Sequence, residues 1–278
     1  MVQLIFMLRF AAGAALGGPA TDAVAVSVVI AAAGWLAATW AVYLLNGVAD
    51  VVEDRENCST RPIARGELPA GSATTVVWLL AVFGLVAAAI VSVTMVVLVA
   101  LMLAVGWAYS MGPSPLKRNV AGFVFAVTVL GLLTYLAGWC ACGGGKPNES
   151  LLLFGVAMSL WMALGGSTKD LPDTRGDWLA GRRTLPVLLG ERRARLAMAV
   201  AASLLGWMFV ILGAVWVDHL LPVALVVCAG SAALALVALT SISGGDRCAK
   251  RRPYHAFMVT QYLAHVSLFI CLELALTG

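Results

Sequence analysis

Apolar segments of about 20 residues recur along almost the whole chain, and they restrict the fold more than any other feature. A helix needs roughly 20 mostly apolar residues to cross the hydrocarbon core of a bilayer. Residues 76–108 alone form an unbroken run without one charged side chain. Of the 278 residues, 62% are hydrophobic and 12% are charged, with a mean hydropathy of +0.95. A soluble domain is about one quarter charged, so this composition indicates a membrane protein.

Breaks in hydropathy predict nine spanning helices with short connections. Their ranges are about 2–18, 24–49, 71–90, 93–110, 119–140, 150–170, 193–215, 219–243 and 254–276. The break near 91–93 is the least marked, but one helix over 76–108 would exceed a core roughly 30 Å thick, which favours two helices. The first segment carries one charge, Arg9, and is interpreted as a spanning helix rather than a signal peptide. We therefore expect an all-α integral membrane protein, with residues 1–278 forming a single domain.

The basic residues are distributed unequally between the two sides of the predicted helices. Connections after the second, fourth, sixth and eighth spans, with Arg195 just inside the seventh span, hold 16 of the 18 Lys and Arg residues; the others are Arg9 and Lys146. The positive-inside bias places these four connections and the N-terminus in the cytoplasm, and the C-terminus outside. Ten of the 14 Asp and Glu residues lie on the same side. Orientation alone does not require acids, so they need another explanation.

The second predicted span ends in an acidic stripe. Asn46, Asp50 and Asp54 follow one another at intervals of four residues, which places their side chains on one helix face. Three oxygen-bearing side chains at the end of an otherwise apolar helix are typical of a site for a hard cation.

A similar stripe follows the sixth span. Asp170, Asp173 and Asp177 have the spacing i, i+3 and i+7, and they share a face if the helix continues past Pro172. Carboxylates this close to a membrane usually mark function. Mg²⁺ is typically held by one or two carboxylates, waters and substrate phosphates, so we expect each stripe to hold one Mg²⁺ and both ions to bind one diphosphate.

Basic side chains accompany the acidic stripes on the same connections. The planar guanidinium of arginine can donate two parallel hydrogen bonds to phosphate oxygens, and the ammonium of lysine adds a compact positive charge. The residues concerned are Arg61, Arg65, Lys117, Arg118, Lys169, Arg182 and Arg183. Helices in lipid, paired acids and basic connections together predict a lipid diphosphate as the substrate.

Three ordered motifs resemble the signatures of the UbiA superfamily of membrane prenyltransferases. The first is Asn46-x3-Asp50-x3-Asp54 followed by Thr60-Arg61-Pro62-Ile63-Ala64-Arg65-Gly66. The second is Asp170-x2-Asp173-x2-Gly176-Asp177 followed by Gly181-Arg182-Arg183-Thr184-Leu185-Pro186-Val187. Between them, Tyr109-Ser110-x2-Pro113-x2-Leu116-Lys117-Arg118 is similar to the family's tyrosine–lysine loop. One departure is Gly47, where many members have Asp.

The resemblance implies nine helices around a central cavity, a cytoplasmic cap of Asp-rich loops, two Mg²⁺ ions and a prenyl diphosphate. The metal ligands it implies are Asn46, Asp50, Asp54, Asp170, Asp173 and Asp177. We interpret the five aspartates and Lys117 as catalytic. The substrate-binding set is Asn46, Arg61, Arg65, Tyr109, Arg118, Lys169 and Arg182. Tyr109 has two interpretations, an aromatic at the membrane interface or a side chain that points into the cavity.

The expected reaction transfers a prenyl group from its diphosphate to a small aromatic acceptor, in quinone or meroterpenoid biosynthesis. A terpene cyclase on the same scaffold is an alternative, because it would ionise the same donor and need no acceptor. Transfer of a prenyl group to a sugar phosphate is a more distant alternative. A secondary transporter would carry its charges near the midplane, whereas these lie at helix ends. The expected partners are the bilayer, the donor and the acceptor, with no nucleic acid.

Overall fold

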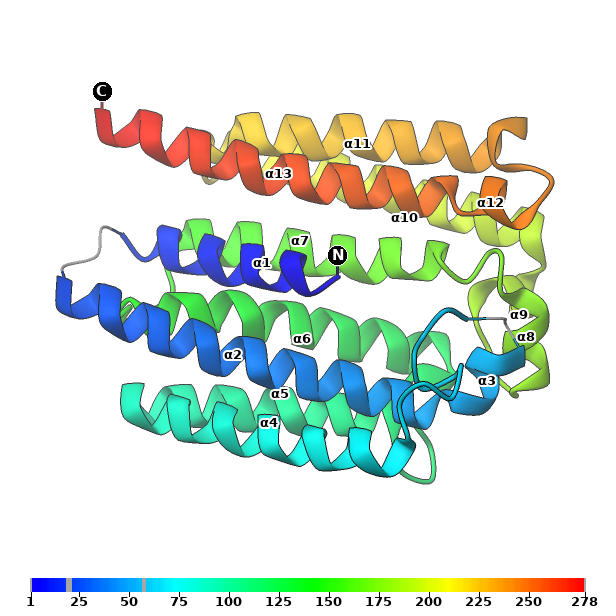
Figure 1. Cartoon of the computed structure of the whole chain (residues 1–278). Helices are drawn as coiled ribbons and strands as arrows, with labels where there is room; N and C mark the ends of the chain where they lie inside the picture. Colours follow the sequence, from blue (N-terminus) through cyan, green and yellow to red (C-terminus); the bar gives the residue numbers. More distant parts are fainter. Residues whose placement is uncertain (1, 19–21, 57–58, 278) are drawn as a thin grey trace. The chain divides into compact units, whose positions relative to one another are not determined.

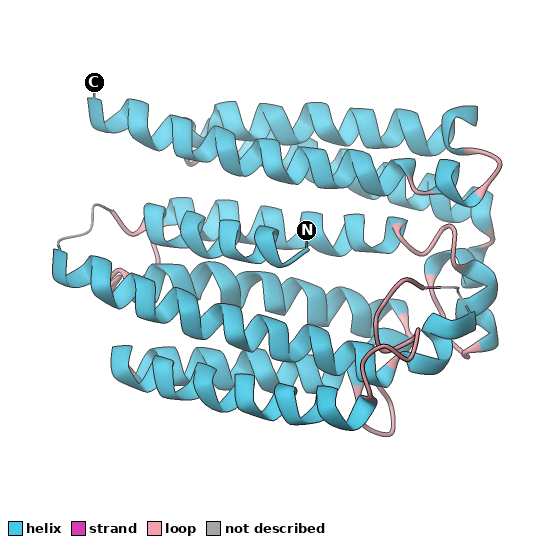
Figure 2. Cartoon of the chain, in the orientation of Figure 1, coloured by secondary structure: helices cyan, strands magenta, loops and turns pink. Residues whose placement is uncertain are grey.

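The computed structural model describes residues 2–18, 22–56 and 59–277, which fold into helices joined by turns and loops (Figure 1). Every regular element of these residues is helical (Figure 2). Two compact units make up the chain, Met1–Pro147 and Asn148–Gly278.

The first unit contains seven elements in its described residues. They are α1 (Val2–Leu16), α2 (Asp22–Ala49), α3 (Val51–Glu56), α4 (Ala70–Val91), α5 (Val93–Ser110), the 3-10 turn η1 (Leu116–Arg118) and α6 (Val120–Ala141).

The second unit contains nine elements in its described residues. They are α7 (Glu149–Thr168), α8 (Thr174–Leu179), α9 (Leu185–Leu189), α10 (Glu191–Val215), η2 (Asp218–Leu220), α11 (Leu221–Leu239), η3 (Ser241–Ser243), α12 (Arg247–Lys250) and α13 (Arg252–Thr277).

Eight helices in the described residues are long and apolar enough to cross a membrane. These spans lie in α2, α4, α5, α6, α7 and α10, in η2 together with α11, and in α12 together with α13. The remaining predicted span is the apolar helix α1, which has 15 residues. At 1.5 Å per residue it is about 22 Å long, less than a core roughly 30 Å thick. The all-helical membrane fold is confirmed, and the predicted number of nine is approximate.

Ser92 separates α4 from α5, at the break that the hydropathy marks least. Its backbone is extended, with φ −170° and ψ 160°, and its hydroxyl accepts a hydrogen bond from the amide of Met95 at 3.1 Å. A serine hydroxyl in this N-cap position satisfies an amide that the helix itself leaves unpaired. Two helices rather than one therefore cover residues 76–108, as predicted.

Glycines bring α1 and α6 into close contact in the first unit. A Cβ added to Gly13 would lie 2.0 Å from the carbonyl oxygen of Tyr135, and one added to Gly138 would lie 1.9 Å from that of Phe10. Small residues at helix interfaces allow backbones to approach closely in membranes. The same interface buries Arg9 completely, with its guanidinium carbon 5.3 Å from the centre of the Phe6 ring.

Aromatic side chains fill the core of the second unit, in which α7 packs against α10 and α13. The ring of Phe154 on α7 lies 6.5 Å from that of Phe209 on α10 and 5.3 Å from that of His265 on α13. Trp161 is fully buried, and its indole donates to the carbonyl of Phe257 at 3.4 Å. These contacts hold α7 firmly, and the second acidic motif begins directly after its end.

Candidate active site

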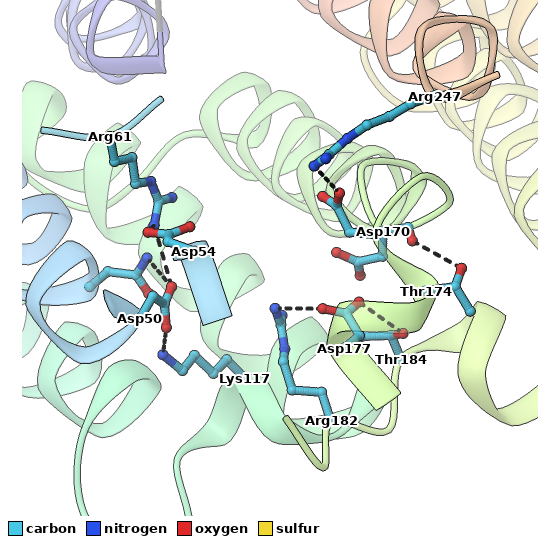
Figure 3. Close-up of polar contacts among 12 residues, drawn as sticks. Asp50, Asp54, Arg61, Lys117, Asp170, Thr174, Asp177, Arg182, Thr184 and Arg247 are labelled. Atoms are coloured by element: carbon cyan, nitrogen blue, oxygen red, sulfur yellow. Dashed lines mark hydrogen bonds and ion pairs between the residues drawn. The ribbon is translucent and has the colours of Figure 1, made fainter. Parts of the chain in front are cut away.

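Asp50 is the centre of the polar cluster in the first unit. The Lys117 ammonium donates to its Oδ1, and Asn46 Nδ2 donates to its Oδ2 at 2.8 Å. Arg61 Nη1 lies 3.4 Å from Asp50 Oδ2 and 2.9 Å from Asp54 Oδ2, so one guanidinium joins both carboxylates (Figure 3). Asp50 and Lys117 are buried, at 7% and 4% exposed. Five of the predicted site residues, Asn46, Asp50, Asp54, Arg61 and Lys117, are thus brought together.

The predicted stripe of the first motif is present although α2 ends at Ala49 and α3 begins at Val51, with Asp50 between them. The amide of Asp50 donates to the carbonyl of Asn46 at 2.9 Å, and that of Asp54 to the carbonyl of Asp50 at 2.7 Å. This i to i+4 pattern continues from α2 into α3 and keeps the three side chains on one face. Arg61 lies against the same face, because its guanidinium contacts both Asp50 and Asp54.

Ser110, the last residue of α5, orients the amide of Asn46. Its hydroxyl donates to Asn46 Oδ1 at 3.1 Å, so the amide nitrogen faces Asp50. An amide oxygen has two lone pairs, and one remains for a further ligand. Tyr109, its neighbour, is half-buried and packs its ring 6.4 Å from that of Phe123. Ser110 was not among the residues predicted for the site, although it lies in the tyrosine–lysine loop.

Two basic residues predicted to bind substrate, Arg65 after the first motif and Arg118 in the tyrosine–lysine loop, do not join the Asp50 cluster. Arg65 forms an exposed ion pair with Glu67, 2.5 Å between Nη2 and Oε1. Arg118 is exposed, and its neighbour Lys117 is the residue that reaches Asp50.

Asp177 is a buried carboxylate of the second unit that two side chains bind. Arg182 Nη1 donates to its Oδ1 at 3.1 Å, and the Thr184 hydroxyl donates to its Oδ2 at 3.2 Å (Figure 3). The side chain of Asp177 is 2% exposed. Gly181 follows α8 with φ +70°, a conformation that glycine adopts without strain, and it turns the chain so that Arg182 and Thr184 come back to Asp177.

The shared helix face expected for the second motif is not present, because the helix does not continue past Pro172. Helix α7 ends at Thr168, turns cover residues 169–173, and α8 begins at Thr174. Proline lacks an amide hydrogen and disfavours helix in the residue before it, which explains the break. Across the turns, Lys169 is exposed whereas Asp170 is buried.

Burial changes the ionisation of two carboxylates in the second motif. The pKa of Asp170 is raised to about 7, chiefly by loss of water on burial; the charges of Lys169 and Arg182 oppose this shift, and those of Asp177 and Asp173 add to it. Burial also raises the pKa of Asp177, against the effects of Arg182 and Thr184. A nearby cation favours the charged form of such carboxylates.

Arg247 lies in the connection between α11 and α13 and contacts the second motif. Its Nη2 is 2.5 Å from Asp173 Oδ1 (Figure 3, the dashed line that leaves Arg247). From the sequence, Arg247 was counted only among the basic residues that predict which connections face the cytoplasm. No pattern indicated the contact, because 74 residues separate the two positions.

The side chains of both motifs offer oxygen donors only, from carboxylates and one amide. Among the described residues, no group of three or more His, Cys, Asp or Glu side chains is close enough to hold a metal ion by itself. Mg²⁺ prefers oxygen and does not need such a cage, since it is bound through one or two carboxylates together with water and substrate phosphates. The donor set therefore fits Mg²⁺.

Comparison with protein families identifies the class. The model of the UbiA prenyltransferase family matches residues 5–260, which include both acidic motifs and the tyrosine–lysine loop. The chain belongs to the UbiA prenyltransferase family. It is a multi-pass integral membrane protein and a prenyltransferase, as predicted from the sequence.

Two similar proteins carry names of different prenyltransferases. Digeranylgeranylglyceryl phosphate synthase from Halobacterium salinarum is 34% identical over 197 residues, 71% of this chain and 67% of the relative. A probable homogentisate phytyltransferase 2 from Oryza sativa is 34% identical over 162 residues, 53% of this chain and 41% of the relative.

A solved structure has the same fold. It is that of a UbiA homolog from Archaeoglobus fulgidus bound to DMAPP and Mg²⁺, with a TM-score of 0.72 and 20% sequence identity over 98% of this chain and 96% of that chain.

Proposed function

We propose that the protein catalyses Mg²⁺-dependent transfer of a prenyl group from a prenyl diphosphate to a small aromatic acceptor. The observation that carries this proposal is the Asp50 cluster, in which a buried carboxylate at the end of a spanning helix is held by Asn46, Arg61 and Lys117. The Archaeoglobus fulgidus homolog of similar fold binds DMAPP and Mg²⁺, which supports both the donor and the metal.

The acidic motif of each unit is proposed to bind one Mg²⁺ ion. The ligands are Asn46, Asp50 and Asp54 in the first unit and Asp170, Asp173 and Asp177 in the second. Bound Mg²⁺ supplies positive charge that stabilises the diphosphate as it leaves. Ser110 keeps the Asn46 amide oriented, and Thr184 holds the carboxylate of Asp177 in place.

Cationic side chains are proposed to bind the diphosphate oxygens. Arg61, Lys117 and Arg182 already lie against the acidic motifs and are the first candidates. Arg65, Arg118 and Lys169 are exposed on the same connections and are proposed as further contacts. Because negative charge grows on the diphosphate as its carbon–oxygen bond breaks, these groups stabilise the transition state more than the bound donor.

Cleavage of that bond leaves an allylic cation, which an electron-rich ring attacks before it loses a proton to restore aromaticity. Tyr109 is proposed to contact substrate from the end of α5, where its ring is half-buried. The Oryza sativa relative, named as a homogentisate phytyltransferase, supports an aromatic acceptor. The Halobacterium salinarum relative favours a second candidate, an acceptor of the glyceryl phosphate type.

Two further assignments belong to this proposal. Residues 1–278 act as a single UbiA-type domain, since the family model extends over both units. The N-terminus and the Asp-rich connections face the cytoplasm and the C-terminus faces outward, because 16 of 18 basic residues lie on the cytoplasmic side of the predicted helices.

The decisive experiment measures turnover by the detergent-purified chain with Mg²⁺ and prenyl diphosphates of graded length. Reactions run with aromatic acceptors, with glyceryl phosphate lipids and with no acceptor, and mass spectrometry follows diphosphate release and organic products. A prenylated ring that requires acceptor and disappears with chelator supports the proposal. A prenylated glyceryl phosphate supports the second candidate. A hydrocarbon or terpene alcohol formed without acceptor would instead identify a cyclase.

A further inference from the structure

The last polar connection of the second unit, residues 240–251 between α11 and α13, supplies a side chain to the second acidic motif. Arg247 donates to Asp173 from this connection, and the two side chains are 42% and 25% exposed. Neither acidic motif nor the tyrosine–lysine loop includes Arg247. Its position next to a proposed Mg²⁺ ligand therefore requires an explanation.

Arg195 holds the start of this connection against α10. Its buried guanidinium donates to the carbonyl of Ala238 at 3.2 Å, to the carbonyl of Ser243 at 2.8 Å and to the Ser243 hydroxyl. Ser243 is completely buried. A buried arginine with several carbonyl partners fixes backbone, because breaking the contacts would leave buried polar groups unpaired.

A second set of contacts holds the end of the connection. Lys250 Nζ donates to Glu191 Oε2 at 2.6 Å, and Glu191 also accepts from Arg195 at 2.8 Å. Asp246 accepts a hydrogen bond from the amide of Ala249 at 2.7 Å and so begins α12, whose first residue is Arg247. Arg247 is therefore presented to Asp173 from backbone that is fixed on both sides.

The Arg247–Asp173 pair is suited to exchange of partners. A water-exposed ion pair contributes little stability, so it can be broken at small cost. Mg²⁺ and Arg247 compete for the same carboxylate, because both are cations. If Asp173 bound Mg²⁺, the guanidinium would stay on its fixed connection and would be available to donate hydrogen bonds to diphosphate oxygens, which match the planar geometry of an arginine.

We propose that Arg247 neutralises Asp173 in the metal-free protein and becomes a diphosphate-binding residue when Mg²⁺ takes that carboxylate. The inference rests on the proposed function, which supplies the Mg²⁺ and the diphosphate. It predicts effects of opposite sign when Arg247 is replaced. Mg²⁺ alone binds more tightly, and diphosphate binds less tightly.

The test compares Arg247→Gln with Arg251→Gln, an exposed arginine of the same charge on the same connection. The first measurement is the Mg²⁺ concentration that gives half-maximal thermal stabilisation of the full chain without diphosphate. Arg247→Gln should lower it about threefold, as expected for loss of an exposed ion pair. The second is calorimetric binding of inorganic pyrophosphate at saturating Mg²⁺, which Arg247→Gln should weaken about tenfold because a charge-assisted contact is lost.

Arg247→Lys should recover part of the pyrophosphate affinity, and Arg251→Gln should change both quantities less than twofold. If Arg247→Gln matches Arg251→Gln in both measurements, or weakens both, the inference is wrong. Neither measurement needs turnover. Opposite shifts without turnover of any prenyl diphosphate by the unchanged protein would uphold the role of Arg247 and contradict the proposed function instead.

Discussion

Lys117 and Asp50 are 67 residues apart in the sequence, and the lysine ammonium donates directly to the aspartate carboxylate. Both residues are buried. The contact joins the short turn before α6 to the end of α2, and Arg61 and Asn46 complete the surroundings of the carboxylate. This pair therefore connects the stability of the first unit with the chemistry proposed for it.

Replacing Lys117 with Met should both destabilise the protein and slow turnover. Removal of one partner from a buried ion pair leaves the other charge uncompensated, which costs about 3 kcal/mol. Loss of a cation that is proposed to bind the leaving diphosphate should lower kcat about 100-fold. Denaturant unfolding in detergent and steady-state kinetics measure the two effects, with Lys146→Gln, an exposed lysine of the same unit, as the control.

The double variant Lys117→Met with Asp50→Asn separates the two roles. It should recover much of the lost stability, because neither charge remains buried, and it should stay inactive. Recovery of activity in the double variant would show that Asp50 and Lys117 are structural only.

Thr184→Val tests the support of Asp177. The exchange removes the hydroxyl that donates to Asp177 Oδ2 and keeps the shape of the side chain. Because Asp177 is a proposed Mg²⁺ ligand, loss of the residue that orients it should weaken Mg²⁺ binding about tenfold. The Mg²⁺ dependence of turnover measures this effect. Thr184→Ser retains the hydroxyl and should behave like the unchanged protein, so equal weakening in both variants would argue against this role.

Chelation should abolish turnover reversibly, and Mg²⁺ should stabilise the folded chain. A ligand present at 100 times its Kd stabilises a protein by about 2.7 kcal/mol. Thermal unfolding in EDTA and in excess Mg²⁺ measures the difference. The variant Asp50→Ala combined with Asp173→Ala should lose turnover and most of the stabilisation. If Mg²⁺ stabilises that variant against thermal unfolding as much as it stabilises the unchanged protein, the metal binds elsewhere.

Gly138→Ala should destabilise the first unit without touching the acidic motif. The new methyl group would lie 1.9 Å from the Phe10 carbonyl oxygen, so α1 and α6 must move apart. Overpacking of this kind costs about 1–3 kcal/mol. Gly71→Ala, where the added Cβ meets nothing within 4 Å, is the matched control and should be neutral or slightly stabilising. If both variants unfold at the same midpoint temperature, the close packing of α1 against α6 at Gly138 is contradicted.

Local spacing and hydropathy were enough to predict most of the helices and the first acidic stripe. Asn46, Asp50 and Asp54 lie on one face because the i to i+4 backbone bonds continue from α2 into α3. The second stripe depended on continuation of the helix past Pro172. That condition failed because proline disrupts helix, and turns cover residues 169–173.

Contacts between distant segments could not be predicted from the sequence. Arg65 has the same motif context as Arg61, yet it pairs with Glu67 instead of Asp50 or Asp54. Arg247 and Arg195 were counted only as markers of orientation, although one contacts Asp173 and the other is buried against Ser243. Which basic side chain reaches which partner depends on tertiary packing, and neither charge nor spacing encodes it.

The extended backbone of Ser92 determines on which side of the membrane Lys117 emerges. Between Asp50 and Lys117 the chain passes through α4 and α5, two crossings, and an even number returns it to the side it left. A single continuous helix would make the number odd and leave the lysine about 30 Å away, across the hydrocarbon. The Lys117–Asp50 pair therefore requires an even number of membrane crossings between the two residues, and the break at Ser92 provides it.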